Sequence, residues 1–196
     1  MTAQVALIMA GGTGGHIFPG LALAEGLRER GWQVHWLGAA APSMESELVP
    51  ARGFPMQTID FGGLRGKGWR PLLRLPVRLL AALLQSRRIL HHLRPGVVVG
   101  FGGYISFPGA CMARWQGIPL LLHEQNSIAG MANRWLSRWA TKVFCAFPHA
   151  LPQGQWVGNP LRAEFLKQPD PAQRYANRHG PLRLLVDRKS TRLNSS

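Results

Sequence analysis

A hydrophobic run that ends directly in a glycine loop constrains this chain more than any other feature. Residues 5–10 are all apolar, which is typical of a strand buried on both faces of a parallel sheet. Residues 11–16 then read Gly-Gly-Thr-Gly-Gly-His. Glycines at a strand-to-helix turn let backbone amides approach an anion, and the helix N-terminus adds partial positive charge. The pattern favours a diphosphate site over a tight turn that binds nothing.

The loop matches neither of two well-known nucleotide motifs. The dinucleotide fingerprint requires G-x-G-x-x-G, but Gly12 and Gly14 are followed by Ile17. No acidic residue ends the next strand near Leu37 to hold a ribose, and no Gly-Lys-Ser/Thr follows the glycines. A cofactor-dependent oxidoreductase is therefore disfavoured.

Short apolar runs alternate with helical patterns as far as residue 146. The predicted strands are 5–10, 33–37, Met56–Ile59, Val97–Gly100, 120–123 and 142–146. The predicted helices are 19–30, 43–52, 76–94, 108–116 and 131–139. This alternation predicts an α/β fold with a Rossmann-like, doubly wound parallel sheet.

The charge of the chain is strongly one-sided. Its 196 residues carry 23 Lys and Arg against 9 Asp and Glu, a net charge of +14. Between Asp60 and Glu164 the only acidic side chain is Glu124, which argues against paired-carboxylate catalysis there. The excess favours a surface that faces phosphates. Nucleic acid is the weaker choice because no helix-turn-helix, zinc or RNA-binding signature is present.

Several other classes of protein are disfavoured. The uncharged stretch 95–113 could resemble a membrane span, but prolines and glycines interrupt it. Cys111 and Cys145 stand in apolar surroundings without a secretory signal, so we expect reduced thiols. No cysteine or histidine pair has zinc-binding spacing, and we expect neither a metal nor a cofactor.

Polar residues near the ends of predicted strands are the candidate functional groups. His16 could hold or relay a proton near a bound diphosphate, or only cap or pack the helix start. Glu124, directly after a leucine strand, is either a salt-bridge partner of an arginine or a functional acceptor or base. Asn126 offers amide groups to a sugar or uracil. Gly102 and Gly103 form a second glycine turn at the same predicted edge.

The helix 76–94 is predicted to be amphipathic. Its core side carries Leu79, Ala82, Ile89, Leu90 and Leu93, and its opposite side Val77, Leu80, Leu84, Arg87, Arg88 and His91. Upstream, Trp69, Leu72 and Leu73 alternate with Lys67, Arg70 and Arg74. Leucines flanked by arginines suit an anionic membrane surface. The alternative is that Leu80 and Leu84 pack on a neighbouring element.

Five motifs in order carry a resemblance to a known family. They are the loop 11–16 with Pro19-Gly20, the glycine-rich segment 62–68, Gly102-Gly103-Tyr104, His123-Glu124-Gln125-Asn126 and Gly158-Asn159-Pro160. Together they resemble the MurG family from about residue 5 to residue 186. Members are bacterial N-acetylglucosaminyltransferases that complete the lipid-linked disaccharide precursor of peptidoglycan.

The resemblance implies a GT-B fold of two Rossmann-like domains with the active site between them. The N-terminal domain, residues 1–160 here, would bind the lipid-linked muramoyl-pentapeptide acceptor. It would associate peripherally with anionic lipids on the cytoplasmic face of the inner membrane. Cell-wall or division proteins are further partners expected from the family. The missing C-terminal domain would hold most of the UDP-N-acetylglucosamine.

The resemblance also implies roles for individual residues. UDP-N-acetylglucosamine would contact Thr13, Gly14, Gly15, Asn126 and Arg162, and the acceptor diphosphate would contact Gly102, Gly103 and Tyr104. His16 or Glu124 would help to deprotonate the 4-hydroxyl of the acceptor. That hydroxyl would attack the anomeric carbon with inversion and expel UDP, without a metal at the reaction centre.

The end of the chain departs from the family. Members continue past the strand at 182–186 into a second glycine loop and a complete donor domain, whereas residues 188–196 have neither glycines nor periodicity. We therefore expect 161–187 to be a linker and the first strand of a truncated donor domain, 188–196 to be a non-native tail, and the fragment to be inactive. The alternative function is a non-catalytic module that binds membrane and diphosphate.

Overall fold

The computed structural model describes residues 4–62, 74–176, 178 and 180–181. The chain divides into two compact units, 1–163 and 164–196, which are described separately below. The predicted domain boundary at residue 160 stays a prediction. The predicted strand at 182–186 and tail at 188–196 lie outside the described residues, as do Trp69, Leu72 and Leu73.

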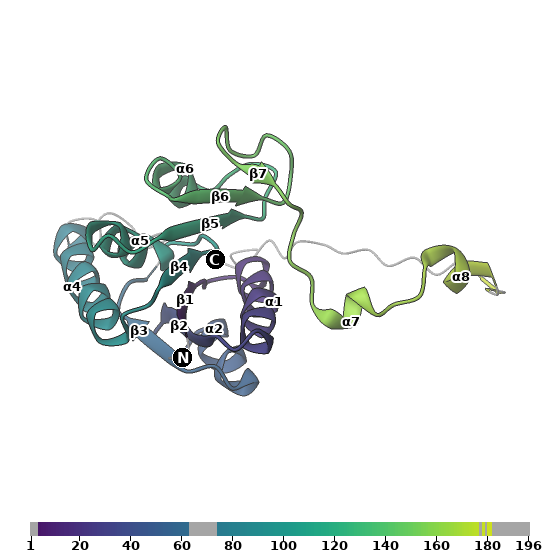
Figure 1. Ribbon diagram of the computed structural model, residues 1–196, viewed down its shortest axis with the longest axis horizontal. Coiled ribbons are helices and arrows are strands. Elements are labelled where there is room, and N and C mark those ends of the chain that lie inside the picture. The colour runs from purple at the N-terminus through teal and green to yellow at the C-terminus, as the bar shows by residue number, and fades with distance from the viewer. Residues whose placement is uncertain (1–3, 63–73, 177, 179, 182–196) are drawn as a thin grey trace, which may run out of the picture. The chain divides into compact units, whose positions relative to one another are not determined.

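The first unit is built on one parallel sheet of seven strands in the order β3-β2-β1-β4-β5-β6-β7 (Figure 1). The strands are β1 Val5–Met9, β2 Gln33–Ala39, β3 Met56–Ile59, β4 Val97–Gly100, β5 Leu120–Glu124, β6 Lys142–Cys145 and β7 Gln155–Trp156. Every neighbouring pair is parallel. The predicted Rossmann-like sheet is confirmed.

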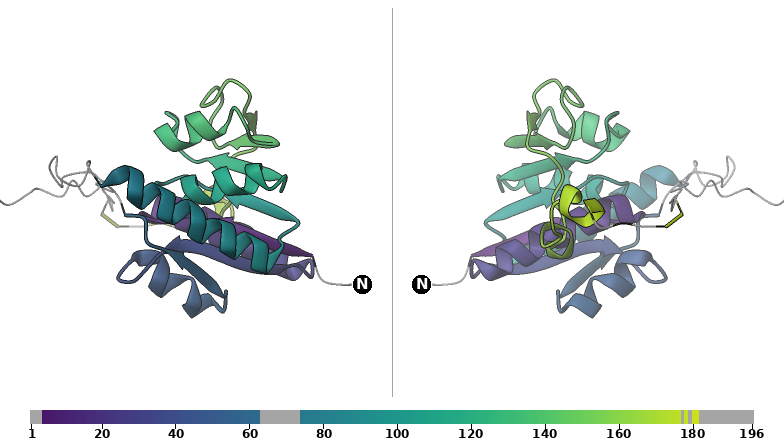
Figure 2. Two further views of the ribbon diagram at one scale, coloured as in Figure 1. Left: turned by 90° about the vertical axis from the view of Figure 1, so that its left-hand side faces the viewer. Right: turned by 90° about the vertical axis from the view of Figure 1, so that its right-hand side faces the viewer.

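Helices cover both faces of this sheet (Figure 2). They are α1 Gly14–Glu29, α2 Met44–Leu48, the short 3₁₀ turn η1 Pro50–Arg52, α4 Leu75–Leu93, α5 Ser106–Trp115 and α6 Met131–Leu136. In the described part of the second unit, α8 spans Pro171–Ala176, and α7 Ala163–Leu166 crosses the boundary between the units.

The alternation of side chains along β1 explains why its sequence is apolar without interruption. Leu7 and Met9 enter the core beneath α4, α5 and α6, while Ile8 and Ala10 enter the core beneath α1. All four side chains are completely buried. A strand in the middle of a two-sided sheet has no face for polar residues.

Helix α1 begins inside the glycine loop, earlier than the predicted start at Pro19. Thr13 is the N-cap residue, and its carbonyl accepts from the amides of His16 at 3.1 Å and Ile17 at 3.2 Å. These bonds extend the helix back through two glycines, against their low intrinsic propensity. Gly14 and Gly15 therefore form the first turn, where backbone amides have no acceptor within the helix.

Helix α4 divides into the two sides that the sequence predicts. Ala82 and Leu90 are buried in the core, whereas Val77, Leu80 and Leu84 are exposed. The alternative that Leu80 and Leu84 pack on a neighbouring element is not seen within the described residues. None of the described helices is long and apolar enough to cross a membrane.

Candidate functional site

The loops that follow β1, β4 and β5 lie side by side because these strands are neighbours in the sheet. We call this region the carboxyl edge. Parallel α/β sheets bind ligands at this edge, where loops from adjacent strands converge. Most of the candidate residues lie in these loops or at their ends, and Glu45 reaches them from α2.

The two glycine turns, which the sequence predicts to line the same edge, touch each other. Gly102 and Gly103 have φ angles of +90° and +80°, a backbone region that favours glycine. A Cβ atom on Gly103 would stand 2.9 Å from the carbonyl oxygen of Gly11. The hydroxyl of Ser106 lies 2.7 Å from the Gly102 carbonyl and 3.0 Å from the Met9 carbonyl, which ties the second turn to β1.

A buried acid that the sequence analysis did not identify, Glu45, supports the first turn from behind. Its carboxylate accepts from the amide of Gly12 at 3.2 Å and from the amide of Ala39 at 3.2 Å. Gly11 leaves the space that this carboxylate needs, since a Cβ there would collide with it. The amide of Gly12 is thus occupied, and the first amides of α1 remain as donors for an anion. The only sequence signal near Glu45 is Ser43, two residues before it, whose side chain forms the capping box at the start of α2.

Glu124 lies at the end of β5 and is 1% exposed. Its Oε1 accepts from the backbone and side-chain amides of Asn126, at 2.9 and 2.8 Å. Its Oε2 accepts from the Gly130 amide at 3.1 Å and from Asn133 Nδ2 at 2.9 Å. The arginine salt bridge that the sequence allowed is absent from the described residues. Glu124 therefore holds the loop between β5 and α6 through four neutral donors.

A chain of hydrogen bonds links His16 to β5. His16 Nδ1 lies 2.8 Å from Gln125 Oε1. Gln125 Nε2 lies 3.1 Å from His123 Nδ1 and 2.8 Å from the His123 carbonyl. His123 Nε2 lies 2.9 Å from the Gly158 carbonyl. We call His16, Gln125, His123 and Gly158 the histidine–glutamine chain.

Burial determines the protonation state of His123 within this chain. Loss of hydration lowers the pKa of its imidazole, although the Gly158 carbonyl and the Glu124 carboxylate act in the opposite direction. Its ring also lies 5.5 Å from the ring of Phe101. His123 is therefore a neutral, packed side chain at neutral pH.

The histidine at the start of α1 contacts the second glycine turn. The His16 ring carbons Cε1 and Cδ2 lie 3.4 and 3.8 Å from the Cβ positions of Gly102 and Gly103. Among the residues that the structure describes, none makes a hydrogen bond to His16 Nε2. His16 is half-buried, which leaves part of the residue open to solvent.

Two further predicted residues lie beside the first glycine turn. The Arg162 guanidinium carbon stands 4.9 Å from the ring centre of Phe18, which itself lies against Gly14. Tyr104 approaches the Cβ position of Gly12 to 3.6 Å. The structure thus brings Arg162 and Tyr104 to the region that Thr13, Gly14, Gly15 and His16 occupy.

The membrane residues predicted on α4 lie elsewhere, on the solvent side of that helix.

The structure describes no group of three His, Cys, Asp or Glu side chains arranged to hold a metal. Burial raises the pKa of the Cys111 and Cys145 thiols, which makes both poor nucleophiles at neutral pH.

The parallel sheet and its glycine turns define a class of protein: residues 6–145 match the N-terminal domain of glycosyltransferase family 28, and the chain belongs to this family. The fold is that of the N-terminal half of a GT-B glycosyltransferase. Within the family, the predicted membership of the MurG group is confirmed by the relatives described next.

The similar proteins include curated transferases and a solved MurG. The chain is 63% identical over 183 residues to the UDP-N-acetylglucosamine–N-acetylmuramyl-(pentapeptide) pyrophosphoryl-undecaprenol N-acetylglucosamine transferase of Acidovorax sp. (strain JS42), covering 93% of this chain and 46% of that protein. It is 63% identical over 190 residues to the transferase of that name from Albidiferax ferrireducens, covering 95% and 49%. The crystal structure of Acinetobacter baumannii MurG superposes with a TM-score of 0.70 and 38% identity, over 81% of this chain and 46% of that one.

More distant structures share the fold alone. The UDP-GlcNAc 2-epimerase of Methanocaldococcus jannaschii superposes with a TM-score of 0.57 at 14% identity, over 75% of this chain and 40% of the epimerase. The chain spans about half the length of the curated relatives that it matches.

Proposed function

We propose that this chain is the acceptor-binding half of an inverting transferase. The complete enzyme would move N-acetylglucosamine from UDP-N-acetylglucosamine to the 4-hydroxyl of a lipid-linked muramoyl-pentapeptide. The printed names of relatives 63% identical to the chain support this donor and this acceptor. The observation that carries the proposal is the position of His16, whose Nδ1 is bound to Gln125 and whose ring lies against both glycines of the second turn.

In this proposal His16 is the catalytic base. Its Nε2 takes the proton of the acceptor hydroxyl as the oxygen attacks the anomeric carbon of the donor sugar. The bond from that carbon to the UDP oxygen breaks, and UDP leaves with the electron pair. A positioned general base contributes about 10²- to 10⁴-fold to such a step.

Glu124 acts differently in this proposal. Both of its oxygens are occupied by amide donors, so the carboxylate is a positioning residue for Asn126. The Asn126 side chain would then meet the donor in a fixed orientation. Thr13, Gly14, Gly15 and Arg162 would hold the rest of UDP-N-acetylglucosamine near the first turn of α1.

The second glycine turn would bind the acceptor diphosphate. Gly102 and Gly103 lie against the ring of His16, and Tyr104 approaches Gly12 of the first turn, so a diphosphate there would bring the acceptor sugar to the base. The edge suits anionic substrates, because the acids described there, Glu45 and Glu124, are both buried and accept hydrogen bonds from amides.

Transfer by residues 1–196 alone is not expected, because the relatives carry about as much sequence again. The decisive test is a chimera in which residues 1–163 replace the corresponding part of the Acidovorax enzyme. Transfer of labelled N-acetylglucosamine to a lipid-linked acceptor is expected, with a loss of about 10²-fold or more in kcat for His16→Asn. A folded chimera that binds the acceptor without transfer would favour the non-catalytic module, and full activity of His16→Asn would remove its role as base.

Peripheral membrane association is a second part of the proposal. The α4 outer face, made of Val77, Leu80, Leu84, Arg87 and Arg88, is exposed. The Arg87 guanidinium carbon stands 5.3 Å from the ring centre of Trp115, which is 67% exposed at the end of α5. Arginine beside tryptophan and leucine is the composition that binds the interface of an anionic bilayer.

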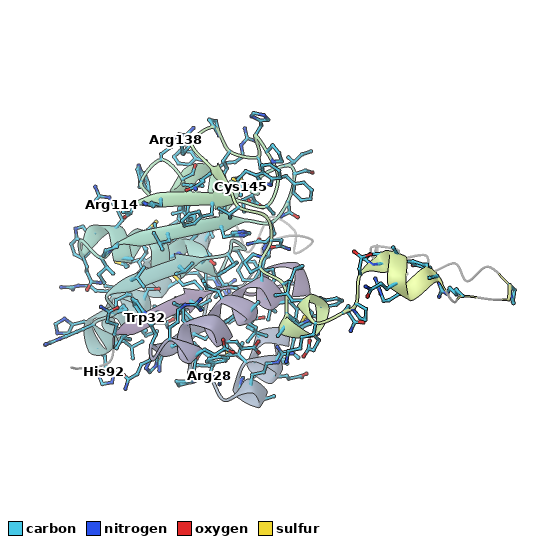
Figure 3. The ribbon with its side chains drawn as sticks, turned by 45° about the vertical axis from the view of Figure 1, so that its right-hand side comes forward. Arg28, Trp32, His92, Arg114, Arg138 and Cys145 are labelled. Carbon is cyan, nitrogen blue, oxygen red and sulfur yellow. The ribbon has the colours of Figure 1, made fainter. Side chains whose placement is uncertain are left out.

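Helix α6 extends this surface over the same side of the sheet (Figure 2). Met131, Trp135 and Trp139 are exposed, and a surface hollow of about 190 Å³ is lined by Met131, Arg134, Trp135 and Arg138. Arg114 and Arg138 lie at the outer edge of the molecule (Figure 3). In this proposal the surface rests on anionic lipid at the cytoplasmic face of the inner membrane, with cell-wall or division proteins as its further partners.

A further inference from the structure

The histidine–glutamine chain can be read as a sequence of donors and acceptors, starting from its buried end. The Gly158 carbonyl only accepts, so the His123 Nε2 atom 2.9 Å away must carry a hydrogen. Burial keeps His123 neutral, and a neutral imidazole has one protonated nitrogen. His123 Nδ1 is therefore an acceptor.

The orientation of the Gln125 amide follows from this assignment. Its nitrogen lies 3.1 Å from His123 Nδ1 and 2.8 Å from the His123 carbonyl, and both of these atoms accept. An amide turned by 180° would place its oxygen against two acceptors. Gln125 is 8% exposed, so the lost bonds would not be replaced readily by water. The Gln125 oxygen must then face His16.

His16 stands at the other end of this chain of hydrogen bonds. Gln125 Oε1 only accepts, so the His16 Nδ1 atom 2.8 Å away carries a hydrogen. In neutral His16 the lone pair then lies on Nε2. Neutral histidine in water prefers the opposite tautomer, with the hydrogen on Nε2, so the chain of bonds reverses the intrinsic preference.

We infer that Gln125 and His123 are positioning residues that hold His16 in its Nδ1-protonated tautomer and so keep Nε2 available to accept a proton. The tautomer follows from the hydrogen bonds and from the burial of His123, while its catalytic use rests on the proposed function. In the motif His123-Glu124-Gln125-Asn126, the sequence pattern predicts a functional role for the acid, Glu124. The arrangement instead makes Gln125 the direct partner of the proposed base.

Nuclear magnetic resonance of the full 196-residue chain tests this inference without any transfer reaction. The chain is labelled with ¹⁵N-histidine, and long-range ¹H–¹⁵N correlations are recorded at a pH where His16 is neutral. His16 Nδ1 is expected at the shift of a protonated ring nitrogen and Nε2 at that of an unprotonated one. The opposite pattern in the unmodified chain would overturn the inference, whether or not the transferase proposal holds.

Two variants then separate the role of Gln125 from general structural damage. Gln125→Met keeps the length of the side chain and removes both polar ends, so His16 is expected to shift toward its Nε2-protonated tautomer. Gln153→Met makes the same chemical change at an exposed position and should leave the His16 resonances unchanged. An unchanged His16 tautomer in folded Gln125→Met would show that Gln125 does not select it. If that variant fails to fold, the pattern in the unmodified chain still decides.

Discussion

The carbonyl oxygen of Gly11 and the α-carbon of Gly103 approach so closely that a Cβ on Gly103 would stand 2.9 Å from that oxygen. The contact joins the loop after β1 to the turn after β4, although the two segments are far apart in the sequence. It leaves no room for a side chain between the turns. The geometry of the carboxyl edge therefore depends on a backbone-to-backbone contact that only glycine permits.

Gly103→Ala should destabilise the chain by about 3 kcal/mol, because it combines a positive φ with a collision against backbone. The matched control is Gly117→Ala, which has φ +71° and open space around it. That control should cost only about 1 kcal/mol. Urea denaturation measures both, and equal losses would show that the contact with Gly11 is unimportant.

Glu124→Gln should cost about 3 kcal/mol of stability, because an amide nitrogen would replace one oxygen that now accepts two hydrogen bonds. Hydrogen exchange at the Asn126 and Gly130 amides should accelerate at the same time. Glu29→Gln, at the exposed end of α1, is the control and should change neither quantity appreciably. Unaltered exchange in Glu124→Gln would contradict the positioning role.

Stability should decline as the pH falls below about 6.5, the ordinary pKa of histidine. Burial lowers the pKa of His123, and burial together with His92 lowers the pKa of His35. In that range the unfolded chain takes up protons that the folded chain does not, so acid favours unfolding. Urea midpoints at pH 7.5 and 5.5 measure the effect. His35→Gln should flatten the dependence, and a midpoint that rises on acidification would refute this account.

Arg87→Gln with Arg88→Gln should weaken binding to anionic vesicles by about 2 kcal/mol, or roughly 30-fold, because each cation near the surface contributes about 1 kcal/mol. The matched control is Arg28→Gln with Arg30→Gln, which removes the same charge from the C-terminal end of α1 on the other face of the sheet, where Arg30 is the C-cap residue. Vesicle flotation compares the two pairs at one salt concentration. Equal weakening would mean that net charge, and not the α4 outer face, causes binding.

The apolar part of the same surface has its own prediction. Leu80→Asp with Leu84→Asp should abolish flotation, since the two exposed leucines are replaced by charges that anionic lipid repels. Both side chains are exposed to solvent, so the variant should still fold. Circular dichroism checks this. Flotation that persists in this variant would place the membrane contact elsewhere.

Much of the fold follows from sequence periodicity. The strands Met56–Ile59 and Val97–Gly100 are predicted to the residue, because short apolar runs between helical patterns have few alternatives. The alternation of strands with helices predicts the parallel sheet, and five ordered motifs predict the family. The start of α1 is different: Pro19 looks like a first helical residue, yet the Thr13 carbonyl begins the helix earlier.

The amino-acid sequence alone determined that glycine turns and polar residues follow particular strands, because strand ends and glycine turns are local features. Only the tertiary structure decided which of their polar atoms are already engaged. Glu45 reaches Gly12 from helix α2, Glu124 binds Gly130 and Asn133 beyond its own strand, and Gln125 meets His16 across the edge. Hydrogen bonds form over about 3 Å in space, whatever the separation along the chain, so a pattern of residues cannot specify them.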